Sequence, residues 1–293
     1  MAEVGLQDRL LLAIPKKGRL MEPSIALLDR CGIKYRRKAR LDVAFSTTMN
    51  VAVVFLPAAD IALFVGEGKV DMGITGQDMV AESGMTESVD QLLELGFGKC
   101  RLCVQAPQSS KIDSGKACAG QRIATTFLHL TDNYFKEIAP NESTKISFIS
   151  GSVEVACALG LAEAVVDLVE SGDTMRAAGL KEVAEIMSSQ AVLIGNPKTS
   201  KKDVMSLVAR RVKGIVDAEK YVMIDYNVRR EHLEKATRIT PGKNSPTLSP
   251  LDDSQWVAVK ALILKNESNA ILDQLQEVGA EAILIYNIKN CRV

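Results

Sequence analysis

The sequence has no excess of charge of either sign. It carries 36 lysines and arginines against 36 aspartates and glutamates in 293 residues. Broad nucleic-acid binding needs a basic surface, so this balance argues against a nucleic-acid partner. No run of about 18 apolar residues is present, and we expect neither a membrane span nor a membrane partner. The N-terminal stretch has a short apolar core with acidic residues ahead of it, which is unlike a secretory signal and favours the cytoplasm.

Histidine is scarce as well, and the six cysteines are scattered. The two histidines, His129 and His232, lie far apart; no Ser-His-Asp or Cys-His arrangement stands out, and covalent catalysis is not indicated. Cys100 and Cys103 form a C-x-x-C, but no second pair or nearby histidine completes a zinc site. The segment around them alternates like a strand, on which positions three apart face opposite ways. We therefore expect reduced thiols in a strand.

Apolar strands alternate with helical patterns through the first two thirds of the chain, which predicts parallel α/β layers. One lobe is expected at residues 1–99 and 190–217, and a second lobe at residues 100–189, with a strand at 191–194 returning to the first. Two lobes joined by crossing strands place a cleft between them, where ligands commonly bind. The other predicted strands are residues 10–14, 51–56, 72–76, 122–126, 146–149 and 164–169, and the predicted helices are residues 21–31, 58–67, 77–82, 129–138, 153–160 and 202–217.

Residues 218–293 change in character. They predict the order β-α-β-β-α-β, which is ferredoxin-like. The domain has no catalytic constellation of its own, and effector binding, an oligomer contact or a purely structural role all remain open from the residues alone. Its predicted strands are residues 221–228, 247–251, 256–264 and 281–288, and its predicted helices are residues 229–237 and 268–278.

The most informative stretch is EVACALGLAEAVVDLVESGDTM at residues 154–175. An apolar strand carrying Asp167 runs into the turn 170–174 and then into a helix. Such a turn exposes free backbone N–H groups, and the helix dipole favours an anion there. Asp167 is well placed for sugar hydroxyls or a metal-bound pyrophosphate, so the stretch suggests a phosphoribosyl donor. An ordinary strand-to-helix turn is the alternative. If the turn does bind an anion, the carboxylate of Asp173 must point to solvent or to a metal, because it repels the ligand.

Three other stretches carry weaker signals. The basic turn 16–19 follows a strand and suits polyphosphate binding, although the residues alone favour a solvated turn. Residues 71–78 contain two glycines that permit close approach of a ligand, and a carboxylate there could orient a base or ribose. Thr125 and Thr126 are either polar contacts in the cleft or helix caps.

The stretch at residues 154–175 also resembles the ATP phosphoribosyltransferases of histidine biosynthesis. The matching positions are Glu154, Gly160, Ala162, Val165, Asp167, Ser171, Gly172, Thr174 and Met175. This gap-free match is far more specific than a single glycine-rich loop. The resemblance continues in order through PKKGRL, GKVDMGITGQDMV and TPGKNSPTLSPL, and it covers essentially the full chain.

The resemblance implies the long form of the family. Its two catalytic lobes resemble type II periplasmic solute-binding proteins, and its C-terminal regulatory domain is similar to ACT domains. The implied reaction transfers phosphoribosyl from 5-phosphoribosyl 1-pyrophosphate to N1 of ATP, with Mg²⁺ accompanying the pyrophosphate. Histidine is the implied feedback inhibitor, and the implied homo-oligomer is a dimer that assembles to a hexamer.

The resemblance and the turn together assign roles to residues. Catalytic roles fall on Asp167, Glu163 and Arg19, with Asp167 also a weak metal ligand. The donor would bind at Glu170, Ser171, Gly172, Asp173 and Thr174, and the nucleotide at Lys17, Gly18, Arg19, Asp71, Thr75 and Arg101. Histidine would bind at Asn227, Thr247, Leu262 and Ala282. Related long forms can have Asp at the position of Asn227, and an amide cannot pair with a cation as a carboxylate can, which leaves the strength of inhibition open.

Two other functions compete with this interpretation. A solute-binding or sensor protein would use the same two lobes without catalysis, but it has no need for an acid before a phosphate turn. A phosphoribosyltransferase for a free base usually has two adjacent acids before its turn, whereas here Val166 precedes Asp167.

Overall fold

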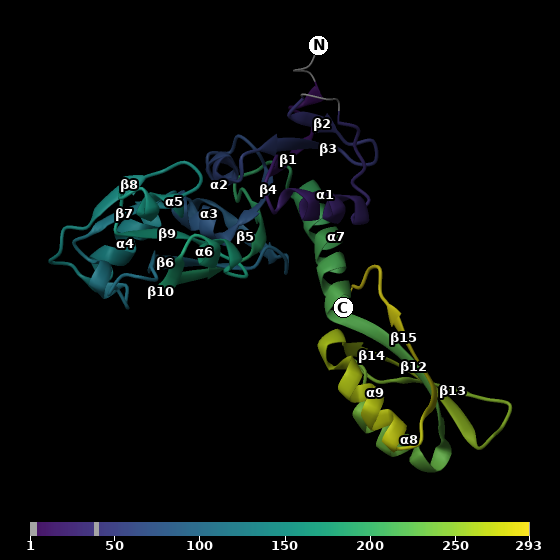
Figure 1. Cartoon of the computed structure of the whole chain (residues 1–293). Coiled ribbons are helices and arrows are strands. Elements are labelled where there is room, and N and C mark those ends of the chain that lie inside the picture. The colour runs from purple at the N-terminus through teal and green to yellow at the C-terminus, as the bar shows by residue number, and fades with distance from the viewer. Residues whose placement is uncertain (1–4, 38–40, 293) are drawn as a thin grey trace. The chain divides into compact units, whose positions relative to one another are not determined.

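The computed structural model describes residues 5–37 and 41–292. The chain divides into two compact units, Met1–Ala209 and Arg210–Val293, and the boundary falls inside helix α7 (Lys202–Lys220). Figure 1 traces the elements of both units. The first unit contains two sheets and the second contains one. Within the described residues, no helix is long and apolar enough to cross a membrane.

The first sheet, of six strands in the order β2-β3-β1-β4-β11-β5, forms one lobe. Its central strand β1 is parallel to β3 and β4, so the carboxyl ends of these three strands share one edge. β1 reads LLLAIP, a nearly continuous apolar run that is typical of a strand buried on both faces. The strands are β1 (Leu10–Pro15), β2 (Val43–Phe45), β3 (Val51–Leu56), β4 (Met72–Gly76), β5 (Asp90–Glu94) and β11 (Ala191–Gly195), and the helices are α1 (Met21–Arg30), α2 (Ala58–Gly66) and α3 (Gln77–Glu82).

The second sheet, of five strands in the order β10-β6-β9-β7-β8, forms the other lobe. Strand β9 is at its centre, and its two faces pack on separate cores: Val166 lies in one with Leu102 and Phe135, and Val165 lies in the other with Leu180. The strands are β6 (Cys100–Pro107), β7 (Arg122–Thr125), β8 (Lys145–Phe148), β9 (Ala164–Val169) and β10 (Leu180–Ser189), and the helices are α4 (Leu128–Ile138), α5 (Val155–Ala158) and α6 (Asp173–Ala177).

The chain passes between the two lobes twice, from β5 to β6 and from β10 to β11. β11 inserts antiparallel between β4 and β5, as expected of the returning strand at residues 191–194. The predicted fold class, a two-lobed core like that of type II periplasmic solute-binding proteins with a C-terminal ferredoxin-like domain, is confirmed.

The structure corrects several details of the prediction. The sheets are mixed rather than parallel, because β6, β10 and β11 run antiparallel to their neighbours. Strand β10 was not predicted, since two register shifts interrupt the alternation of its side chains. The helix expected at residues 153–160 is only the four-residue α5, and Gly160 beyond it has a φ of +69°.

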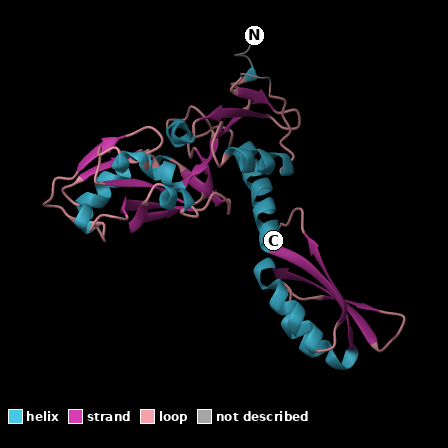
Figure 2. Cartoon of the chain, in the orientation of Figure 1, coloured by secondary structure: helices cyan, strands magenta, loops and turns pink. Residues whose placement is uncertain are grey.

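The second unit has the expected ferredoxin-like order. Its antiparallel sheet runs β13-β14-β12-β15, and both helices lie on one face (Figure 2). Burial alternates strictly along β12, whose buried residues, such as Ile224 and Tyr226, meet the helices. Neither of these two helices covers the opposite face. The elements are β12 (Tyr221–Arg229), α8 (Leu233–Ile239), β13 (Thr247–Pro250), β14 (Trp256–Leu264), α9 (Ser268–Glu277) and β15 (Glu281–Asn287).

Candidate active site

The turn between β9 and α6 encloses a cavity of about 340 Å³ at the cleft. Gly172 begins the helix with a φ of +80°, a conformation that strains any residue with a side chain. A Cβ at this position would also lie 2.7 Å from the guanidinium of Arg176. The cavity is lined by Arg19 from the first lobe and by Leu168, Val169, Glu170, Ser171, Gly172, Asp173, Thr174 and Met175 from the second.

Side chains of the turn differ in their freedom to bind a ligand. Ser171 donates its hydroxyl to Asp173 at 2.6 Å, and Arg176 contacts the other oxygen of that carboxylate at 2.6 Å. These two interactions hold the pKa of Asp173 below its usual value, and its side chain is 79% exposed, so it does point to solvent. The hydroxyl of Thr174 has no partner in the described part of the chain and remains available to an anion.

A neighbouring helix terminus is already occupied by protein groups. Glu82 of the first lobe accepts hydrogen bonds from the backbone N–H groups of His129 and Leu130, at the start of α4. Thr125 accepts from the N–H of Phe127 and donates to a carbonyl of β9, so its buried hydroxyl is neither a cleft contact nor a cap of α4. The start of α4 and the hydroxyl of Thr125 therefore offer no free donor to a ligand in the cleft.

Asp167 lies two residues before the end of β9. One of its oxygens accepts a hydrogen bond from the N–H of Leu168 at 2.8 Å. Burial raises the pKa of Asp167, the charge of Glu154 raises it further, and the charge of Arg19 opposes the shift. Glu154 belongs to the motif at residues 154–175, where the sequence assigns it no role. In the structure its charge acts on the carboxylate of Asp167.

Arg19 connects the two lobes. It follows β1, and its guanidinium contacts the carboxylate of Glu170 at 2.5 Å and the sulfur of Cys100 at 2.9 Å. The carboxyl ends of β1 and β9 thus meet across the cleft, which is the edge where open α/β sheets bind ligands.

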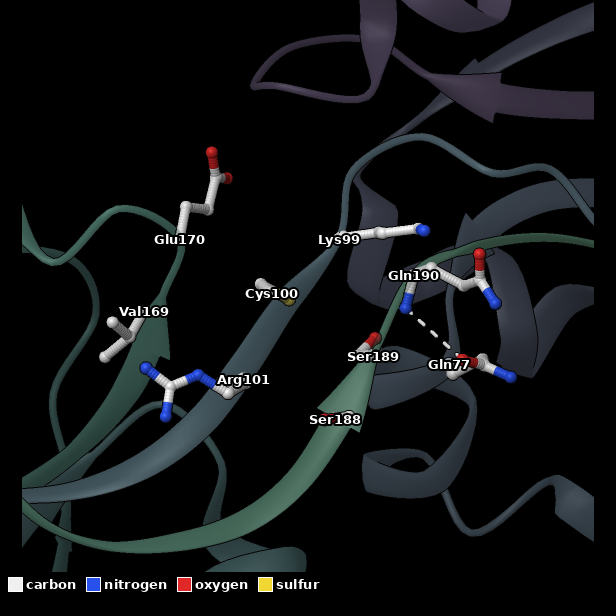
Figure 3. A pocket seen from close by; sticks show the side chains of 9 residues that line it. All are labelled: Gln77, Lys99, Cys100, Arg101, Val169, Glu170, Ser188, Ser189 and Gln190. Carbon is white, nitrogen blue, oxygen red and sulfur yellow. Dashed lines mark hydrogen bonds between the residues drawn. The ribbon is translucent and has the colours of Figure 1, made fainter. Parts of the chain in front are cut away.

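A second cavity of about 340 Å³ adjoins the first, and Val169 and Glu170 line both. Figure 3 shows its walls: one side follows the start of β6, and the other follows the end of β10. It lies where the chain passes between the lobes, so we refer to it as the hinge cavity. Its lining residues are Gln77, Lys99, Cys100, Arg101, Val169, Glu170, Ser188, Ser189 and Gln190.

Most residues of the hinge cavity were not predicted as site residues. Ser188 and Ser189 belong to β10, whose bulges conceal it in the sequence. Gln77 and Gln190 pair through backbone and side-chain hydrogen bonds, although 113 residues separate them. No local motif signals such a contact, and only the lysine and arginine beside the C-x-x-C mark the segment as basic.

The predicted nucleotide residues separate into two groups. Lys17, Gly18 and Arg19 lie together in the turn after β1, and Arg101 lines the hinge cavity, where it also contacts Glu182 at 2.5 Å. Asp71 lies before the amino end of β4 and binds Lys201, Thr199 and the N–H of Leu11. Thr75 is fully buried and donates to the carbonyl of Ala58. The last two side chains therefore have structural partners and are not directed into either cavity.

Glu163 is separated from the turn by the length of β9. It precedes the strand, and the guanidinium of Arg122 binds both of its oxygens, which lowers the pKa of Glu163. An acid with a lowered folded pKa contributes stability that is present above its ordinary value, here 4.5, and is lost as the pH falls through the lowered value.

Replacing Glu163 with glutamine is therefore expected to leave turnover within about twofold and to lower the melting temperature at neutral pH. The difference from the wild type should shrink as the pH falls from 4.5 through the lowered pKa of Glu163, below which neither protein has the ionised pair. Thermal unfolding over a pH series, with steady-state rates beside it, checks this. A tenfold loss of turnover with an unchanged melting temperature would restore a catalytic role.

The structure places the C-x-x-C in a strand with both thiols free, as predicted. Cys100 and Cys103 are free and buried in β6. Burial raises the pKa of Cys103 to about 12, so its thiol stays protonated and unreactive at neutral pH. Across residues 5–37 and 41–292, no group of three or more His, Cys, Asp or Glu side chains could hold a metal by itself.

A divalent ion that is bound together with a phosphate ligand needs fewer protein ligands. Mg²⁺ commonly takes one or two protein carboxylates and completes its shell with phosphates and water. Asp167 fits that requirement, because only one of its carboxylate oxygens accepts a hydrogen bond from a described residue and the charge of Glu154 is nearby.

Two of the predicted effector residues lie together on the second unit. Asn227 of β12 pairs with Ala258 of β14 and Glu281 of β15. Ala282 follows at a bulge, where its φ is +51°. Asn227 belongs to the sheet face opposite the helices.

The other two form a second pair on the same face. Thr247 pairs with Lys260, and Leu262 lies two residues further along β14. Leu262 is four residues from Ala258, the partner of Asn227, which corresponds to about 13 Å along the strand. One chain therefore presents two separate pairs on an open surface rather than one enclosed pocket.

Comparison with known proteins decides the family. The family described as "HisG: ATP phosphoribosyltransferase" matches residues 57–215, and "HisG, C-terminal domain" matches residues 218–290. The ATP phosphoribosyltransferase of Yarrowia lipolytica is 46% identical over 293 residues, covering 99% of this chain and 98% of the relative. That of Saccharomyces cerevisiae is 45% identical, with 98% of each chain covered. This chain belongs to the ATP phosphoribosyltransferase family.

Solved structures with a similar fold support this family assignment. A chain of the ATP phosphoribosyl transferase (HisG:HisZ) complex from Thermotoga maritima matches with a TM-score of 0.62 and 25% identity, over 71% of this chain and 98% of that one. The structure of Tv2483 bound to L-arginine, with a TM-score of 0.52 and 10% identity over 74% and 89%, shares the fold alone. As a member of an ATP phosphoribosyltransferase family, the chain is an enzyme and a transferase.

Proposed function

We propose that this chain transfers the phosphoribosyl group of 5-phosphoribosyl 1-pyrophosphate to N1 of ATP. The products are N1-(5-phosphoribosyl)-ATP and pyrophosphate, and the step is the first of histidine biosynthesis. The observation that carries the proposal is the turn at residues 171–174, with its left-handed Gly172 and the free hydroxyl of Thr174, in a chain of this family.

The two adjoining cavities suggest how the substrates divide the cleft. The backbone and hydroxyls of the β9–α6 turn bind the donor's 5-phosphate, and Asp167 meets the ribose hydroxyls. The hinge cavity takes the nucleotide, with Lys99 and Arg101 inside it and the Lys17–Arg19 turn beside it supplying cations for phosphates. Asp71 and Thr75 act on this region through the backbone that they hold in place.

The proposed reaction depends on alignment of the two reactants rather than on a covalent intermediate with the protein. A ribose carbon that loses pyrophosphate develops oxocarbenium character, and adenine N1 is a weak nucleophile. Holding the two reactants in line can lower such a barrier by about 7–11 kcal/mol. Arg19 stabilises the departing charge, and closure of one lobe on the other excludes water. Bound Mg²⁺ would neutralise part of the pyrophosphate charge, with Asp167 as its protein ligand.

A transfer assay with labelled donor tests the function. Product is expected with ATP and not with adenine. Tight binding of small molecules without product would favour a solute-binding protein, and a preference for adenine would favour a free-base phosphoribosyltransferase.

Replacing Thr174 with alanine is expected to lower kcat/KM for the donor at least about tenfold, because a hydrogen bond to a charged phosphate is lost. Steady-state kinetics with varied donor measure this. Thr86→Ala, which removes a hydroxyl from an exposed threonine that lines neither cavity, is the matched control. Near-normal donor kinetics in the Thr174 variant would show that the donor's phosphate does not bind at this turn.

We also propose that histidine inhibits the enzyme through the second unit. A small zwitterion gains little burial on an open sheet face, so the pairs Asn227–Ala282 and Thr247–Leu262 would enclose it only when contributed by two copies of the chain. This requires a homo-oligomer, which we propose to be a dimer that assembles to a hexamer. The expected compartment is the cytoplasm.

A further inference from the structure

One ion pair connects the two sides of the proposed donor site. Arg19 and Glu170 are 151 residues apart and belong to different lobes, and their side chains meet at 2.5 Å. The arginine side chain is 29% exposed and the glutamate side chain 55%. Such a pair is weak enough to open when a better partner arrives.

The position of Glu170 argues against a direct role in binding phosphate. Its carboxylate has the same sign of charge as the ligand, and Glu170 lines both cavities. A carboxylate and a phosphate present similar pairs of oxygens to a guanidinium, so they compete for the same donors. The other carboxylate of the turn, Asp173, is held at the surface by Arg176. Glu170 is thus the acid whose partner faces the cleft.

We propose that Glu170 is a tethered competitor for Arg19, which it occupies until the pyrophosphate of the donor displaces it. The proposal rests on the function proposed above and assigns this side chain a role opposite in sign to substrate binding. On displacement, the guanidinium exchanges one anionic partner for another and needs no reorientation, because its second contact, with the sulfur of Cys100, remains. Arg19 is therefore positioned before the substrate arrives.

The test is calorimetric titration of the full chain with the donor alone and with inorganic pyrophosphate. Glu170→Gln is expected to tighten both about three- to tenfold, because a competing charge is removed. ATP titrated in the same way is expected to change less, since it is the donor's pyrophosphate that replaces Glu170 at Arg19. In turnover, KM for the donor should fall and kcat should stay within about twofold, whereas pyrophosphate should inhibit at a lower concentration.

Two controls separate this role from general electrostatics. Asp132→Asn removes a negative charge and an equally short ion pair, with Lys136 at 2.5 Å, from α4 of the same lobe, and it should change neither affinity. In an Arg19→Gln background, Glu170→Gln should no longer tighten binding. Tightening that persists there would overturn the proposal in favour of simple charge repulsion.

The outcome also distinguishes the proposal from the function on which it rests. If the wild-type protein binds no donor, both the competitor role and the proposed function are wrong. If the wild-type protein binds and transfers while Glu170→Gln binds equally or more weakly, only the competitor role is overturned. Weaker binding would in addition indicate that Glu170 contacts the donor. Glu170→Ala, which also deletes the carboxylate, repeats the test if the glutamine variant has a lowered melting temperature.

Discussion

Asp167→Asn is expected to lower kcat about tenfold to a hundredfold without lowering the melting temperature. The amide keeps the hydrogen bond from the N–H of Leu168, so the local backbone is preserved. It loses the negative charge that we propose to meet the ribose hydroxyls and Mg²⁺. Steady-state rates and thermal unfolding of the same preparation check both halves of the expectation.

The sign of the stability effect follows from the pKa of Asp167, which burial raises. An acid with a raised folded pKa destabilises the fold when ionised, and that cost disappears as the pH falls through the raised value. Asparagine removes the cost at neutral pH, so the variant should melt at the same temperature or higher. The wild-type rate should fall on the acidic side at a pH above that of an ordinary aspartate, and the variant should lack this limb.

Two outcomes would contradict the assignment. A normal rate in Asp167→Asn would place the ribose and metal elsewhere. A lower melting temperature together with a lower rate would indicate a structural role. Asp132→Asn, an exposed change of the same type, is the control for the loss of charge.

Asn227→Ala and Leu262→Ala are each expected to raise the histidine concentration for half inhibition about tenfold or more, with activity in the absence of histidine unchanged. The two residues belong to the two pairs that lie about 13 Å apart along the open face of the sheet. If each site combines one pair from one chain with the other pair from a second chain, loss of either pair opens the site.

Mixed oligomers make this prediction sharper. When the two variants are co-expressed, some interfaces combine the intact Leu262 side of one chain with the intact Asn227 side of the other. Partial histidine inhibition should therefore return in the mixture, although each variant alone is insensitive. A site built within one chain predicts no recovery, and normal inhibition of both single variants would reject the second unit as the effector domain.

The β9–turn–α6 segment could be predicted from the sequence because it is continuous. A central strand, its single acid, the turn and the helix start follow one another without a gap, and the strand bounds agree with the prediction at residues 164–169. The ferredoxin-like unit was predictable for a similar reason, since its two central strands, β12 and β14, alternate cleanly. A local sequence pattern is therefore enough to predict a feature that lies within one continuous segment.

The hinge cavity could not be predicted, because its walls come from segments far apart in the sequence. Gln77 meets Gln190, and Cys100 meets Arg19, without any local signal. Strand direction, by contrast, indicates from the sequence where Asp71 and Glu163 lie. Both precede their strands, and ligands bind beyond the carboxyl ends of strands in open α/β sheets, so strand direction alone places them at the far edge.

The two connections between the lobes limit how the cleft can change. One of them is clamped at its end, where the buried hydroxyl of Ser189 donates to Asp78 at 2.7 Å and accepts from its N–H at 3.0 Å. Sliding one lobe past the other would break this clamp, because Ser189 ends a strand of one lobe and Asp78 belongs to a helix of the other. A rotation about the two connections can keep the clamp intact, so the orientation in which sugar and purine meet depends on the hinge, on residues that need not touch either reactant.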